Sequence, residues 1–179
     1  RRQLILMSSL KPLPCRTADR SLDNAAPFRH SAPVTGDEVQ WRRVAVYLVC
    51  RDHDGRILLT RCRFPGLPED GMWTMPGGGM EWGESPADTG RRELEEETGL
   101  SGTVGTVLGV FSRWYTSEES WRGEAGQAVG IVVEASALVG ELRTEFAENG
   151  TTDAVRWFTL DEVRSLDCVE LVHFVLTVI

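Results

Sequence analysis

The chain has 179 residues, 41% of them hydrophobic, and it carries a formal net charge of -8 at pH 7. This length supports one well-buried core and is too short for two ordinary domains. The acidic balance argues against duplex nucleic acid as a partner, because phosphate binding needs a Lys/Arg surface. No apolar run reaches the length that spans a membrane, so we expect no membrane partner either. A small anionic ligand would need a bound cation between it and the protein.

Two biases in the composition indicate where the protein works. Its four cysteines lack the CxxC spacing of a zinc site, a pattern typical of reduced thiols rather than of a disulfide framework. Lys11 is the only lysine, so nearly all the positive charge is arginine. These features favour a cytoplasmic protein from a bacterium with a GC-rich genome.

The first part of the chain has no regular pattern. Residues 1–38 mix Pro, Ser, Ala, Asp and Arg without a sustained period. Such a composition predicts a tail that is disordered or loosely packed. We therefore expect one domain, at residues 39–179.

The domain opens with two apolar stretches, residues 44–50 and residues 56–62. Asp54-Gly55 lies between them and is a strong signal for a tight turn. The pattern predicts two partner strands joined as a hairpin. A third, short strand is predicted at residues 72–75.

Three glycines follow Pro76, at residues 77–79, and are expected to stop this strand. Because glycine has no side chain, backbone groups there can approach a ligand closely. A helix is then predicted, with Ser85 as its N-cap, Pro86 at its first position and Asp88 completing a capping arrangement. Gly99 is expected to end this helix.

The rest of the chain predicts further strands and two short helices. Strands are expected at residues 104–115, 128–137 and 154–158, with an acidic loop between the first two. Thr159 and Glu162 form the pattern of a capping box that opens a short helix. With a final helix expected at residues 168–179, the order predicts an α+β or α/β sandwich with a mixed sheet.

Three glutamates of the first predicted helix carry the chemistry. Glu93, Glu96 and Glu97 stand at i, i+3 and i+4, so their carboxylates project from one face within a single turn. Like charges so placed repel, and hard oxygen ligands at this spacing suit Mg²⁺, with Mn²⁺ as a possible substitute. Arg92 can hold a carboxylate through two hydrogen bonds and fix its orientation. The plain alternative is a solvated acidic face.

The segment from Gly78 to Leu100 resembles the signature of the Nudix hydrolases at every fixed position. One local departure is Gly90, where the family usually has alanine or another small apolar residue. Glycine there costs a helix up to about 1 kcal/mol relative to alanine. The matching positions are Gly78, Glu84, Arg92, Glu93, Leu94, Glu96, Glu97, Gly99 and Leu100.

The resemblance implies the Nudix fold, an α/β/α sandwich with a central mixed β-sheet flanked by helices. It implies that Glu93, Glu96 and Glu97 bind a divalent metal together with the carbonyl of Gly77. Arg92 would orient the catalytic carboxylate.

Two further glutamates complete the catalytic residues that the resemblance implies. Glu84 would make a supporting or metal-water contact. Many members also use a glutamate from outside the signature, for which the candidates are Glu118, Glu119 and Glu124. Glu124 is preferred because it lies nearest to a strand start; a solvated loop is the alternative for each.

The implied reaction is metal-dependent cleavage of a pyrophosphate bond in a nucleoside diphosphate linked to another moiety, such as a (d)NTP or a dinucleoside polyphosphate. The candidate substrate contacts are Trp73, Gly78, Gly79, Phe111 and Tyr115. Trp114 and Trp121 are further aromatic candidates, although each aromatic is more often a core residue.

Several alternatives stay open at this point. A Nudix-fold isomerase of isoprenoid diphosphates and a non-hydrolysing nucleotide sensor would share the fold. RNA decapping would need a basic groove that the composition does not indicate. No proline follows Pro86, so a marker of ADP-ribose pyrophosphatases is missing. A homodimer is possible, as in many relatives.

Overall fold

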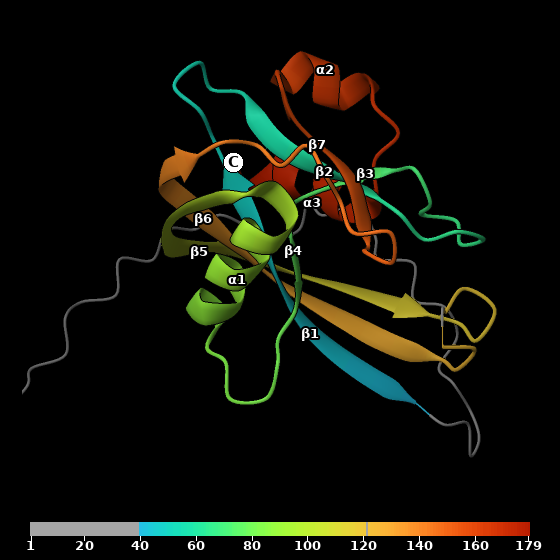
Figure 1. The fold of residues 1–179 in the computed structure, drawn as a ribbon. Helices are drawn as coiled ribbons and strands as arrows, with labels where there is room; N and C mark the ends of the chain where they lie inside the picture. Colours follow the sequence, from blue (N-terminus) through green and yellow to red (C-terminus); the bar gives the residue numbers. More distant parts are fainter. Residues whose placement is uncertain (1–39, 121) are drawn as a thin grey trace, which may run out of the picture. The chain divides into compact units, whose positions relative to one another are not determined.

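The computed structural model describes residues 40–120 and 122–179 (Figure 1). The tail predicted at residues 1–38 lies outside this part of the chain, as does Trp121. No helix within the described ranges is long and apolar enough to cross a membrane. The elements are, in chain order, β1 (Trp41–Cys50), β2 (Ile57–Cys62), β3 (Trp73–Thr74), β4 (Gly77–Gly79), α1 (Pro86–Thr98), β5 (Leu100–Tyr115), β6 (Gly126–Gly140), β7 (Thr152–Phe158), α2 (Leu160–Ser165) and α3 (Glu170–Val178).

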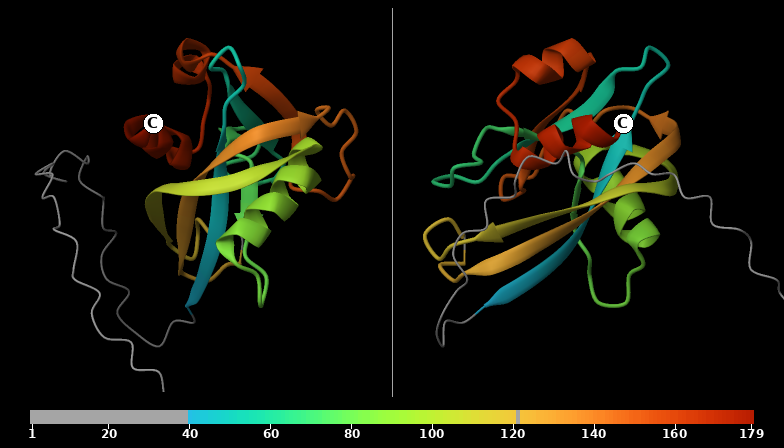
Figure 2. Two further views of the ribbon diagram at one scale, coloured as in Figure 1. Left: turned by 90° about the vertical axis from the view of Figure 1, so that its left-hand side faces the viewer. Right: turned by 180° about the vertical axis from the view of Figure 1, so that it is seen from behind.

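The strands form two sheets, with the orders β4-β1-β6-β5 and β3-β2-β7. In the first sheet β1 runs parallel to β6, whereas the β1–β4 and β5–β6 pairs are antiparallel. Helices α1 and α3 lie on opposite sides of the strands (Figure 2). A mixed sheet with helices on both sides confirms the α+β sandwich expected from the sequence.

Strand β1 is apolar on both faces, as expected for a central strand. Val46 and Leu48 pack with Leu94 of α1, and Val49 packs with Val172 of α3. Successive side chains of a strand point to opposite faces, so one strand contributes to both clusters. Burial of each such side chain stabilises the fold by about 1.5–3 kcal/mol.

The predicted hairpin between β1 and β2 is wrong, because the two strands lie in different sheets. An isolated bridge between Arg51 and Ile57 joins their ends next to the turn. The turn itself forms, with Gly55 at φ 75 and the Asp52 carboxylate accepting from the amides of Asp54 and Arg56. Beyond the turn β1 pairs along its length with β6 and β2 pairs along its length with β7, so the two strands diverge into separate sheets.

The expectation that the three glycines only end the preceding strand was incomplete. They form β4, an edge strand paired with residues 45–47 of β1. Gly77 has φ 144, and a Cβ built there would lie 2.1 Å from the carbonyl oxygen of Val46. Only glycine can bring this strand so close to its neighbour.

Gly90 lies buried on the face of α1 that packs on the first sheet. A Cβ at this position would lie 3.2 Å from Cγ2 of Val104 and 3.4 Å from Cδ2 of Leu48. The missing side chain therefore lets α1 approach β1 and β5 closely. This close packing offsets the helix propensity that glycine sacrifices.

Both ends of α1 are fixed by their own side chains and backbone, as predicted. The Ser85 hydroxyl accepts from the amide of Asp88, and the Asp88 carboxylate accepts from the amide of Ser85. At the other end Gly99 adopts the left-handed conformation, φ 78, and its amide donates to the carbonyl of Glu95. The capping box of Thr159 and Glu162 is also confirmed, at the start of α2.

The three cysteines of the described residues lie in the core. Cys50, Cys62 and Cys168 are buried and unpaired. Burial raises the pKa of both Cys50 and Cys62 to about 12, so neither thiol ionises near neutral pH. These three residues are therefore core side chains.

Replacing Ser85 with alanine removes the capping box of α1. We expect Ser85→Ala to lower the free energy of unfolding by about 1 kcal/mol, because the amide of Asp88 loses its acceptor. Urea denaturation measures this change. The control is Ser101→Ala, an exposed serine of β5 whose hydroxyl makes no hydrogen bond within the described ranges. Equal stability of the two variants would contradict the role of the cap.

Candidate active site

The glutamates of α1 meet the glycine strand β4 along one edge of the first sheet. The side chain of Glu93 is only 12% exposed and lies against Gly78. A Cβ built on Gly78 would lie 2.3 Å from Oε1 of Glu93. The bare backbone of Gly78 is therefore a cradle for this carboxylate, and any other residue would displace it.

Glu97 lies deeper than Glu93 and ties the two sheets together. Its Oε2 accepts from the amide of Gly77 at 2.9 Å, and its Oε1 accepts from Oγ1 of Thr152, the first residue of β7, at 2.8 Å. Burial raises the pKa of Glu97 to about 7, and the charge of Glu93 adds to this effect. The hydroxyl of Thr60 is fully buried close by and has no well-aligned hydrogen-bond partner.

Arg92 is the hub of the site. Its Nε and Nη2 donate to the two oxygens of Glu84 at 2.7 and 3.0 Å. Its Nη1 donates to Glu93 at 2.8 Å and to Glu96 at 3.2 Å. Its Nη2 also donates to the carbonyl of Gly79 at 2.9 Å. One guanidinium therefore connects the loop before α1, the helix itself and β4.

Glu84 is held by four donors of the protein. Besides Arg92, the amide of Glu81 and the hydroxyl of Thr89 donate to its Oε2, at 2.9 and 2.7 Å. The bonds from Arg92 above all lower the pKa of Glu84 to about 2. This carboxylate stays ionised and its oxygens are engaged, so its geometry suits the positioning of Arg92.

The three glutamates expected on one helix face are not equivalent. Glu93 and Glu97 point to β4, whereas the Glu96 side chain is 60% exposed at the rim. Their oxygens do not form a compact group of three in the described residues.

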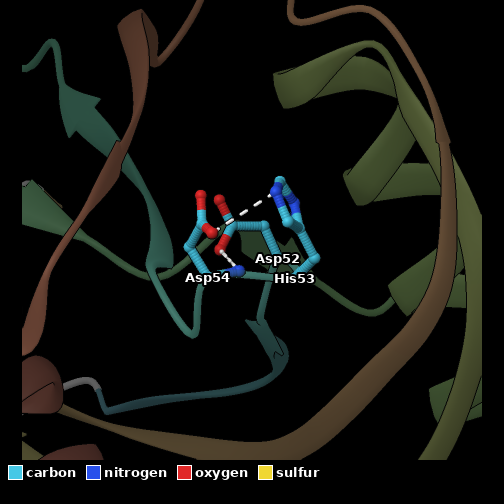
Figure 3. A group of neighbouring side chains, drawn as sticks. All are labelled: Asp52, His53 and Asp54. Atoms are coloured by element: carbon cyan, nitrogen blue, oxygen red, sulfur yellow. Dashed lines mark hydrogen bonds and ion pairs between the residues drawn. The ribbon is translucent and has the colours of Figure 1, made fainter.

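A compact group of three does form elsewhere, in the turn after β1, from Asp52, His53 and Asp54 (Figure 3). Nε2 of His53 lies 3.3 Å from Oδ1 of Asp54. Asp52 already accepts from two amides and from Nε of Arg56. These hydrogen bonds hold the turn together, and this explains why the three side chains lie close to one another.

The residues beside β4 fit a hard divalent cation. Desolvation raises the pKa of Glu93 and of Glu97, so a nearby positive charge would stabilise both carboxylates. The cradle at Gly78 keeps the space beside the Glu93 carboxylate free of side chains. Glu93 and Glu97 would hold the ion from the protein side, with Glu96 at the rim.

The structure does not bring Glu124 beside these glutamates. Its carbonyl accepts from Nε1 of Trp41, at the start of β1. Trp41 pairs with Gly126, whereas Gly79 pairs with Ala45, four residues further along β1. Four residues of a strand span about 13 Å. A catalytic role for Glu124 stays a prediction.

The other candidate glutamates lie in the same loop. Glu119 accepts from the amide of Thr116 within that loop, and Glu118 is exposed. Neither residue contacts β4 in the described hydrogen bonds. Their proposed chemistry therefore has no support from geometry.

The aromatic candidates have different surroundings. Phe111 is 8% exposed and packs on Phe174 of α3, as a core residue does. Trp73 packs edge-on against Phe158. Tyr115 lies on the same sheet face as Arg113, whose guanidinium stands 4.6 Å from its ring centroid. Of the three, Tyr115 is the best placed to meet a ligand on that face.

Three residues of the site escaped the sequence analysis. Thr152 holds Glu97 from a position 55 residues away, and no local pattern connects the two. Tyr47 is buried on the face of β1 opposite α1, where desolvation raises its pKa to about 12. Arg43 lies on that face too, two residues from Ala45, and the alternation along β1 could have placed it there.

Without a bound cation, the buried Glu97 should make stability depend on pH. Its pKa rises from 4.5 to about 7 on folding, so the folded state binds this proton more tightly. We expect the free energy of unfolding, measured with urea in EDTA, to increase as the pH falls from about 7 to about 4.5. Glu97→Gln should flatten this dependence, whereas Glu95→Gln, at an exposed position of α1, should keep it. Identical slopes for Glu97→Gln and wild type would show that Glu97 is not the group responsible.

Several known proteins have sequences similar to that of this chain. A family model described as the NUDIX domain matches residues 41–175. Human diphosphoinositol polyphosphate phosphohydrolase 2 is 34% identical over 86 residues, which cover 47% of this chain and 45% of the human protein. Human diphosphoinositol polyphosphate phosphohydrolase 3-alpha is 40% identical over 60 residues, 34% of each chain. The match thus spans less than half the length of these curated relatives.

Solved structures agree over a longer part of the chain. The MutT NUDIX hydrolase from Burkholderia pseudomallei superposes with a TM-score of 0.61 at 30% identity, over 78% of this chain and 98% of that one. The MutT protein from Methanosarcina mazei Go1 gives a TM-score of 0.62 at 20% identity, over 75% of this chain and 90% of that one, and shows the fold alone. With the domain model matched from β1 into α3, the resemblance seen at residues 78–100 is confirmed: the chain belongs to the Nudix family.

Proposed function

We propose that the protein is a magnesium-dependent hydrolase of a pyrophosphate linkage, acting on a nucleoside diphosphate linked to another moiety, such as a (d)NTP or a dinucleoside polyphosphate. One observation carries the proposal: the Glu93 carboxylate sits in the cradle of Gly78, is oriented by Arg92 and has the buried Glu97 beside it. Paired carboxylates in this setting suit metal binding and proton transfer.

The residues of this chain have distinct parts in the proposed reaction. When bound, magnesium would neutralise the charge of the phosphates and lower the pKa of a water molecule bound to it. Glu93 is the base that accepts the proton of the attacking water, because Arg92 fixes the orientation of its carboxylate. Glu84 positions Arg92, and Glu97 and Glu96 complete the set of metal ligands with the Gly77 carbonyl.

The names of the relatives support the type of bond and leave the substrate open. Two of them are phosphohydrolases of diphosphoinositol polyphosphates, and one solved structure is a MutT hydrolase. All glutamates of the family signature are present, which disfavours a non-hydrolysing sensor. A nucleotide remains the proposed substrate class.

The decisive experiment is a substrate panel with purified full-length protein and magnesium or manganese. The panel contains nucleoside triphosphates, dinucleoside polyphosphates and a diphosphoinositol polyphosphate, with an isoprenoid diphosphate as the isomerase control. We expect release of phosphate, pyrophosphate or a nucleoside monophosphate from at least one nucleotide. Rearranged isoprenoid diphosphate without phosphate release would indicate the isomerase, and binding without turnover would indicate a sensor.

Glu93→Gln should lower kcat by at least about 100-fold, because the variant loses the proposed base while keeping the size of the side chain. Glu95→Gln is the matched control, since Glu95 is exposed on the same helix two residues away. Steady-state kinetics with the best substrate of the panel measures both. Similar losses in the two variants would remove Glu93 from the mechanism.

Gly78→Ala tests the cradle without touching a charged residue. The added Cβ would overlap the Glu93 carboxylate, so the side chain must move away. Moving the Glu93 carboxylate out of its position should cost up to about 100-fold in kcat while the protein stays folded. Gly105→Ala is the control, because the nearest atom to its Cβ is a carbonyl oxygen 3.7 Å away. Full activity of Gly78→Ala would contradict the importance of the Glu93 position.

A further inference from the structure

We propose that Arg43 binds a further phosphate group of the substrate, beyond the phosphate that the glutamates address. The inference rests on the proposed function and narrows its substrate class to molecules with a chain of phosphates. It concerns the face of β4 opposite Glu93. Neither the signature segment nor the comparisons assign a role to this arginine.

Arg43 lies directly against the backbone of the glycine strand. A Cβ built on Gly79 would lie 2.8 Å from Nε and 3.0 Å from Nη2 of Arg43. Gly78 therefore makes room for the Glu93 carboxylate on one side of β4, and Gly79 makes room for the Arg43 guanidinium on the other. Since β4 is an edge strand, both groups border the same open edge.

The charge of Arg43 has no partner in the described part of the chain. A second arginine, Arg113, occupies the same row of the sheet, because both pair with Ala128 of β6. Arg113 lies 3.3 Å from Glu69 and 3.9 Å from Glu170, so its charge is compensated. Arg43 is exposed and makes no hydrogen bond or ion pair with residues 40–120 or 122–179. Within the described residues Arg43 is therefore a positive charge beside the glutamates that an anionic ligand can reach.

Arg43 is also close enough to act on the same ligand as the glutamates. Its charge lowers the pKa of Glu93 and of Tyr47, which lie on opposite faces of the sheet. Because β4 is an edge strand, a chain of linked phosphates that passes around its open edge would meet groups on both of its sides. A guanidinium binds phosphate through parallel hydrogen bonds, which gives geometry as well as charge.

This arrangement distinguishes two kinds of diphosphate substrate. A substrate with a further phosphate would engage Arg43, whereas one that continues as a neutral sugar would leave it unused. The site therefore favours nucleoside triphosphates and polyphosphates over nucleoside diphosphate sugars. That preference is independent of which base the nucleotide carries.

Binding of inorganic phosphates tests the inference without relying on turnover. The probes are orthophosphate and a tripolyphosphate with methylene groups in place of its bridging oxygens, so that it is not hydrolysed. Calorimetric titrations use the full-length protein with magnesium at 0.15 M salt. We expect Arg43→Ala to weaken the tripolyphosphate analogue by about 10- to 100-fold and orthophosphate by less than about twofold.

Arg42→Ala is the matched control, because Arg42 is exposed next to Arg43 and points to the opposite face. We expect it to bind both probes like wild type. Equal losses in Arg42→Ala and Arg43→Ala would reduce the effect to general attraction of anions and overturn the proposal. Absence of tripolyphosphate binding by wild type, or an unchanged affinity in Arg43→Ala, would overturn it as well. A selective loss in Arg43→Ala, with no turnover of any nucleotide, would reject the hydrolase and retain the phosphate site.

Discussion

The ion pairs of Arg92 are the interaction on which the site depends. Three carboxylates surround this guanidinium, and without it Glu84 of the loop before α1 and Glu93 and Glu96 of the helix would repel one another. Charge-assisted hydrogen bonds of this kind are about twice as strong as neutral ones. Because a fifth hydrogen bond reaches the carbonyl of Gly79, the same residue also fixes the distance between α1 and β4.

The glycine strand supplies the complementary constraint. An ordinary strand would place side chains where β4 has none, and the Glu93 carboxylate and the Arg43 guanidinium could not both approach its backbone. The absence of side chains thus creates a place where opposite charges lie on two sides of one strand. Gly90 applies the same principle within α1, since its bare backbone lets the helix settle on the sheet that carries β4.

Local sequence patterns predicted the parts of the structure that depend on local interactions. The caps of α1 at Ser85 and Gly99 are short-range hydrogen bonds, and they fix the register in which the glutamates appear. The hairpin failed because β1 pairs along its length with β6 and β2 with β7, strands that are distant in sequence. The bond between Thr152 and Glu97 and the contact of Arg43 with Gly79 are also long-range, so no window of sequence contains them.

The bond from Thr152 to Glu97 has a consequence for how the molecule would respond to the proposed ion. Glu97 belongs to the helix that packs on the first sheet, and Thr152 opens β7 of the second. Because Glu97 would bind the cation and also accepts a hydrogen bond from the second sheet, a change in the spacing of the two sheets would change the affinity for the cation. By thermodynamic linkage, cation binding would shift that spacing in turn. If Glu97 binds the proposed ion, substitutions at the start of β7 would change its occupancy, although that strand lies outside the signature of the family.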